Sequence, residues 1–173
     1  MTDRAVLISV RPKYCELIAN GEKTIEVQKT RPRTTTPFKC YIYCTKDFYR
    51  KGDGYFQGKS CGKVIGEFVC DKIITVDCDS IVPFDYNTKD YINKESCLSR
   101  DDFVKYAGVK MAYGWHISNL VIYDEPKALS EFYNYDTTYN NAFGWAFSEE
   151  EKRIYLKRPP QSWRYVQEVT DNG

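Results

Sequence analysis

The sequence predicts an α+β fold, in which a small mixed β-barrel of five to six strands carries two or three short helices. Short runs of apolar and β-branched residues recur along the 173-residue chain between turn signals, as strands do. Helix signals of only a few turns separate them. A chain of this length can bury one sizeable core, so we expect a single domain over residues 1–173. No segment repeats at a fixed period, which excludes solenoid architectures.

The first elements follow from local residue patterns. Residues 4–10 are apolar and β-branched, which predicts a strand. A short helix is expected to begin at Pro12, because proline is favoured in a first turn, and to end at Asn20-Gly21. Polar and apolar residues alternate over 23–29, which predicts a half-buried strand. That strand places Thr24, Glu26 and Gln28 on one face.

The later elements are expected in a similar way. Strands are predicted over 38–45, over an apolar run that begins at Lys63, over 115–123 and over 162–169. A capping box at Ser99 predicts a helix that ends at Gly108, and 126–132 is expected to form a helical turn. Residues 79–98 are expected to be irregular. A mobile loop near 46–62, which could act as a lid, and a less regular excursion near 126–153 complete the domain.

Charge is distributed unevenly along the chain. The net charge of +1 alone does not indicate a nucleic-acid binder. Residues 1–63 nevertheless carry a net +7, residues 64–151 a net −9 and residues 152–173 a net +3. If the two basic ends meet in space, they form a basic face that the total conceals; ordinary solvated surface charge is the alternative.

No apolar run is long enough for a membrane span, and no signal peptide is evident, so we expect a cytoplasmic protein with no membrane association. Seven cysteines without regular spacing fit reduced thiols. With no CxxC pair and one histidine, neither a metal nor another cofactor is expected.

The segment from Leu7 to Lys29 carries the most specific motif. Ser9 at the end of a strand, a proline-led helix, and Gly21, Lys23 and Glu26 in a G-x-K-x-x-E pattern resemble the signature of ASCH domains. Gln28 stands where the resemblance leads one to expect arginine. The resemblance implies a PUA-like β-barrel in which this segment forms one wall of a cleft. It implies no single activity, because one fold hosts many functions.

One branch of ASCH-like proteins hydrolyses N4-acylated cytidine with a lysine, a threonine and a glutamate. The resemblance places the lysine on Lys23 and the glutamate on Glu67, but the threonine position falls on Glu26. The nucleophile is therefore missing. A metal-independent amidohydrolase would instead use Glu26 to activate water and Lys23 to stabilise the oxyanion. A structural ion pair between Lys23 and a carboxylate is the competing interpretation.

Recognition of single-stranded RNA or of a modified nucleotide is the function that the sequence favours. Basic residues gather between Arg11 and Arg33 beside several tyrosines, which combines phosphate attraction with surfaces for stacking bases. The residues expected to bind the ligand are Ser9, Arg11, Tyr14, Thr24, Gln28, Arg31, Trp115 and His116. Glu26 and Glu67 are expected to accept hydrogen bonds from base amino groups.

The role of His116 and the class of function both keep an alternative. His116 lies at a strand beside Trp115, where a hydrogen-bonded structural role competes with proton transfer or stacking. A third class of function also stays open, a phage-type accessory protein that docks on and blocks a protein partner. The tyrosine-rich segment 133–147 would be its docking surface.

Overall fold

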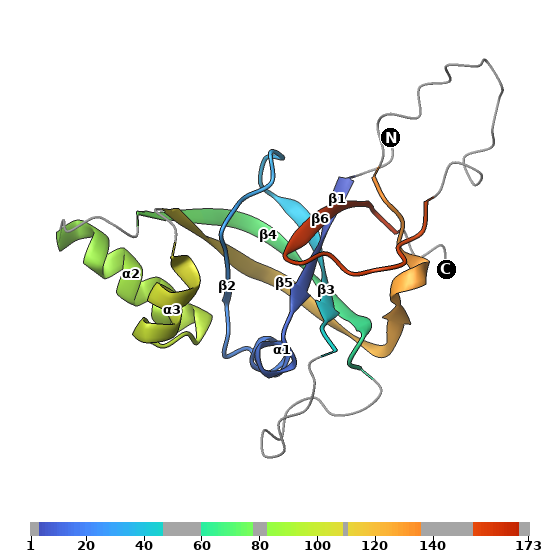
Figure 1. Ribbon diagram of the computed structural model, residues 1–173, viewed down its shortest axis with the longest axis horizontal. Helices are drawn as coiled ribbons and strands as arrows, with labels where there is room; N and C mark the ends of the chain where they lie inside the picture. The colour runs from blue at the N-terminus through green and yellow to red at the C-terminus, as the bar shows by residue number, and fades with distance from the viewer. Residues whose placement is uncertain (1–3, 47–59, 78–82, 109–110, 136–153, 170–173) are drawn as a thin grey trace.

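The α+β fold is confirmed by the computed structural model, which describes residues 4–46, 60–77, 83–108, 111–135 and 154–169 (Figure 1). Six strands, three α-helices and one 3-10 helix are the regular elements of the described part. In chain order they are β1 (Arg4–Val10), α1 (Pro12–Ala19), β2 (Ile25–Gln28), β3 (Phe38–Cys44), β4 (Lys63–Asp77), α2 (Pro83–Ser96), α3 (Arg100–Ala107), β5 (Met111–Ala128), the 3-10 helix η1 (Leu129–Glu131) and β6 (Trp163–Gln167).

The strands form one mixed sheet in the order β2-β5-β4-β3-β1-β6. β1 and β3 are parallel, and the other neighbours are antiparallel. No backbone pairing joins β2 to β6 within the described residues, so the sheet of this ASCH-like fold is not closed. Side chains connect the two edges instead: Ser162 donates to Gln28 at 2.5 Å, and the Trp163 indole donates to Thr30 at 2.9 Å. We call these two hydrogen bonds the edge bridge.

Side-chain alternation divides the core between the two faces of the sheet. Cys40, Ile42 and Cys44 of β3 pack into one buried cluster with Trp115, while Tyr41 and Tyr43 pack into another cluster on the opposite face. This is the separation predicted from the spacing of residues 38–45. The six described cysteines are free thiols.

A third cluster lies between β2, the far ends of β4 and β5, and the helices α2 and α3, which Figure 1 shows together at one end of the long strands. The expectation that residues 79–98 are irregular is therefore wrong for Pro83–Ser96. Its sequence has no regular apolar stripe, and Ile92, fully buried against the cluster, anchors it. Tertiary packing thus stabilises a helix that the local residue pattern does not predict. None of the helices in the described part is long and apolar enough to cross a membrane.

Local signals hold at the ends of the elements. α1 begins at Pro12, and Gly21 follows it with φ +75°, a conformation that glycine adopts without strain. Ser99 caps α3 by accepting a hydrogen bond from the Asp102 backbone at 3.0 Å. Residues 47–59 of the expected lid and residues 136–153 of the excursion expected at 126–153 lie outside the described residues.

Candidate functional site

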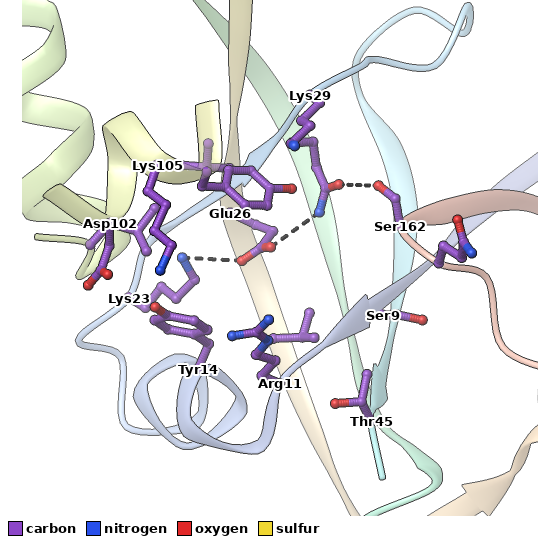
Figure 2. A pocket seen from close by; sticks show the side chains of 16 residues that line it. Ser9, Arg11, Tyr14, Lys23, Glu26, Lys29, Thr45, Asp102, Lys105 and Ser162 are labelled. Carbon is purple, nitrogen blue, oxygen red and sulfur yellow. Dashed lines mark hydrogen bonds and ion pairs between the residues drawn. The ribbon is translucent and has the colours of Figure 1, made fainter. Parts of the chain in front are cut away.

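A pocket of about 530 Å³ opens where four elements meet: the end of β1, helix α1, strand β2 and helix α3. Pro12 starts α1 directly after β1, so the chain turns at Arg11 and leaves that side chain exposed at the pocket. The residues before β6 complete the wall, with Gln161 and Ser162. Figure 2 shows side chains from these segments directed at one space.

Lys23 forms the innermost part of the wall and is only 3 % exposed. Its amine donates to the backbone carbonyls of Ile25 and Ser96, both at 2.8 Å, and lies 3.2 Å from the Glu26 carboxylate. Three acceptors therefore surround an amine that has three protons to donate, which is the arrangement of a fixed ammonium ion. The ring of Tyr14 covers it at 5.2 Å.

Glu26 belongs to a chain of hydrogen bonds that crosses from β2 to the residue before β6 (Figure 2). A carboxylate only accepts, so the Gln28 amide must turn its NH₂ group toward Glu26, at 3.2 Å. The amide oxygen then faces Ser162, which donates to it. Gln28 is 2 % exposed, whereas the Glu26 side chain is 12 % exposed. Lys23 and Gln28 therefore orient a carboxylate whose remaining surface faces the pocket.

Cations and aromatic rings line the rest of the pocket. Arg11, Lys29 and Lys105 join Lys23, against the acidic Glu26 and Asp102, so the lining has a net positive charge.

Tyr14 and Tyr106 supply the aromatic rings of the pocket. Burial, together with nearby carboxylates, raises the pKa of the Tyr14 phenol and raises that of Tyr106 to about 12. Both rings offer a flat face on which a base can stack.

The structure brings six of the predicted site residues to this pocket: Ser9, Arg11, Tyr14, Lys23, Glu26 and Gln28. The hydroxyl of Ser9 donates to the Pro160 carbonyl at 2.6 Å, which ties β1 to the segment before β6. Thr24 is not among the residues that line the pocket, and its hydroxyl donates to Glu95 of α2 at 2.5 Å. Alternation along β2 does not hold at Thr24, because the strand begins only at Ile25.

Glu67 is not brought to Lys23, which corrects the expectation that the two share a cleft. It lies on β4, opposite Tyr41 of β3, and is absent from the pocket lining. Its carboxylate pairs with Lys39 at 3.1 Å and accepts from the Tyr123 hydroxyl at 2.5 Å. Lys39 also pairs with Glu168 at 2.9 Å. Burial lowers the pKa of Lys39, but the hydrogen bonds to Glu168 and Glu67 outweigh it and raise the pKa above its ordinary value.

The other three predicted residues also lie outside the pocket lining. Trp115 is fully buried and packs edge-to-face on Phe38 at 5.6 Å. His116 lies 2.7 Å from the Asp71 carboxylate, and this hydrogen bond lowers the pKa of Asp71. Arg31 follows β2 and is exposed.

Sequence reasoning missed several lining residues. Ser162 falls in an expected strand, and Lys105 and Tyr106 fall in an expected capped helix; no local motif marks them as pocket residues. Thr45, at the end of β3, has a buried hydroxyl without a hydrogen-bond partner in the structure. Within the described residues, no three histidine, cysteine, aspartate or glutamate side chains gather closely enough to hold a metal ion.

Solved structures of other proteins show which fold this chain has. No protein-family model matches the chain, and no curated protein matches its sequence. The crystal structure of ASCH from Zymomonas mobilis is similar, with 19 % identity and a TM-score of 0.53, over 94 % of this chain and 87 % of that one. Two mutants of that protein match at 17 % identity and TM-scores of 0.56; the matches cover 94 % and 96 % of this chain, and 90 % and 92 % of theirs. The chain thus has the fold of ASCH domain proteins, as its N-terminal segment implied.

Proposed function

We propose that this ASCH-fold chain binds RNA or a modified nucleotide, with one base held in the pocket between β2 and α3. The main support for this proposal is the position of the Glu26 carboxylate. Lys23 and Gln28 hold it at the wall of a positively charged cavity that tyrosines line. A volume of about 530 Å³ falls within the range of small-molecule sites. A nucleotide offers what such a cavity complements: a flat ring, hydrogen-bond donors at its edge and an anionic phosphate.

Each group in the pocket has a role in this proposal. Glu26 accepts a hydrogen bond from a base amino group, since its free surface can only accept. Tyr14 and Tyr106 contact the face of the base. Arg11, Lys29 and Lys105 attract the phosphate. Lys23 contributes by holding Glu26 in place, since its three protons already face acceptors.

The geometry does not favour the amidohydrolase alternative. All three Lys23 protons face acceptors already in place, so none is left for a developing oxyanion. Glu67, the other carboxylate of that mechanism, lies elsewhere on the sheet. Docking of a protein partner has no support from the described residues, because the tyrosine-rich segment lies mostly outside them.

Calorimetric titration of the full chain with AMP, CMP, GMP and UMP tests the proposal. We expect binding in which amino-bearing bases are preferred over uracil. Glu26→Gln should weaken that binding about tenfold, because a hydrogen bond to a charged acceptor is lost. Glu125→Gln, which neutralises an exposed carboxylate on β5, is the matched control. Binding of no nucleotide, or equal binding by the two variants, would contradict the proposal.

A separate incubation with N4-acetylcytidine distinguishes the enzyme from the binding protein. Hydrolysis would consume one water and release acetate and cytidine, which chromatography resolves. We expect no release above a protein-free control. Release that Glu26→Gln abolishes would replace binding alone with the amidohydrolase function.

A further inference from the structure

The chain leaves the pocket along a segment with a regular basic pattern. After Gln28, every second residue is basic: Lys29, Arg31 and Arg33. All three are exposed, while Pro32 between the two arginines is buried. Lys29 itself lines the pocket. The three cations thus begin at the pocket and continue away from it on the solvent side; we call residues 29–33 the basic track.

Strand β6 holds the track in place. The indole of Trp163 donates to the Thr30 hydroxyl at 2.9 Å, and the backbone N–H of Arg33 donates to the Tyr165 hydroxyl at 2.6 Å. The two aromatic rings in turn pack edge-to-face at 5.4 Å. Backbone that is already fixed loses less conformational entropy when its side chains bind a ligand. The track is therefore a preorganised row of cations.

Two of the cations lie against tyrosine rings. The Lys29 amine lies 5.1 Å from the ring of Tyr106, which lines the pocket. The Arg31 guanidinium lies 5.9 Å from the ring of Tyr113, which is paired with Gln28 across β2 and β5. The pairs are thus neighbours of the pocket wall. Cations that follow a backbone, interleaved with aromatic surface for bases, are what proteins use to bind single strands.

We propose that the pocket is one subsite of a longer surface and that the track binds the phosphates that follow the pocketed base in a single-stranded polynucleotide. This inference rests on the proposed function and deepens it, because it makes the ligand a strand and not a free nucleotide. A single strand is the favoured ligand, since a base held in the pocket must leave its stack and a duplex would also lose a base pair. Ribose and deoxyribose strands share the chemistry that the track recognises, and the test separates them.

Fluorescence anisotropy with a labelled ten-nucleotide single-stranded RNA of mixed sequence measures strand binding, and calorimetry with AMP and CMP measures the pocket alone. Arg31→Gln should weaken strand binding about fivefold and reduce the slope of log affinity against log salt by about 0.7, as for one lost phosphate contact. Mononucleotide affinity should not change, because Arg31 is not part of the pocket lining.

Lys72→Gln is the matched control, since it removes one exposed positive charge from β4. Arg33→Gln should repeat the Arg31→Gln result, and both sites are exposed, so folding is preserved. The same sequence made as DNA shows which sugar is recognised. Tight binding of RNA alone, or of both RNA and DNA, supports the proposed role of the track. Failure of DNA and RNA alike to bind more tightly than a mononucleotide overturns it.

The failures of the two proposals look different. Glu26-dependent mononucleotide binding with no gain from strand length, or equal strand affinity in Arg31→Gln and Lys72→Gln, overturns the track and leaves the pocket function standing. If neither mononucleotide nor strand binds, both proposals fail.

Discussion

The amine of Lys23 and the carboxylate of Glu26 lie 3.2 Å apart, and the carbonyl of Ile25 between them in sequence accepts a second hydrogen bond from the same amine. A third bond reaches the Ser96 carbonyl at the end of α2. One nearly buried amine therefore joins the pocket wall, the start of β2 and the C-terminus of a helix distant in sequence. Its removal should affect stability and binding together.

Lys23→Met is expected to lower the free energy of unfolding by about 3–5 kcal/mol, because it leaves a largely buried carboxylate without its ion pair and two carbonyls without a donor. Urea denaturation at pH 7 measures the loss. The double variant with Glu26→Gln should lose less than the sum of the two single losses, because the ion pair is broken only once. Additive losses would show that the two groups do not act as a pair.

Ser162→Ala is expected to lower the free energy of unfolding by about 1–3 kcal/mol, because it leaves the buried Gln28 amide oxygen without its donor. Nucleotide affinity should fall as well, since Gln28 orients Glu26. Ser130→Ala, at an exposed site in η1, is the control. Ser162→Thr keeps the hydroxyl and should restore both quantities; failure to do so would place the effect in packing.

Glu67→Gln is expected to leave mononucleotide affinity within about twofold of the parent, because Glu67 pairs with Lys39 and Tyr123 outside the pocket. The calorimetric titration used for Glu26→Gln gives the comparison. A loss as large as that of Glu26→Gln would return Glu67 to the binding site.

Stability is expected to fall as the pH rises from 10 to 12, and Tyr41 contributes to this fall. Burial raises the pKa of Tyr41 to about 12 from its ordinary value of 10.0. Between these values the unfolded chain loses the phenol proton while the folded chain keeps it, so rising pH favours unfolding. Tyr41→Phe removes this proton, and its unfolding free energy should decline less steeply over the same range. Parallel curves in urea denaturation would contradict the assignment.

The sequence predicts the fold best where local chemistry and tertiary packing agree. Pro12 and Gly21 mark the two ends of α1, and the alternation of Cys40 with Tyr41 separates two clusters of the core. Helix α2 escapes prediction because its stability comes from Ile92 in a cluster assembled from distant elements. The open sheet is also beyond local reasoning, since strand order depends on pairings between segments far apart in the chain.

The residues of the pocket also fall into those that the sequence predicts and those that it does not. Alternation over residues 23–29 would place Lys23 on the face opposite Glu26, and only the resemblance of the N-terminal motif to ASCH domains puts the two side chains at one cleft wall; they pair because the strand begins only at Ile25. Glu67 is a candidate through the ASCH resemblance and Trp115 through its aromatic ring, but register places the first beside Lys39 and the second inside the core. Ser162 and Tyr106 reach the pocket from other elements, and only their three-dimensional placement reveals them.

The edge bridge has a consequence for motion. Together with the bond from the Arg33 backbone to Tyr165, the edge bridge connects the β2 edge to β6, and one of its two bonds, Gln28 to Ser162, also supports Glu26. The Gln28 amide thus belongs both to the contact between the two edges of the sheet and to the wall of the pocket. A ligand that binds Glu26 must therefore slow the separation of the two edges, and amide hydrogens near Gln28 and Ser162 will exchange more slowly when the pocket is filled.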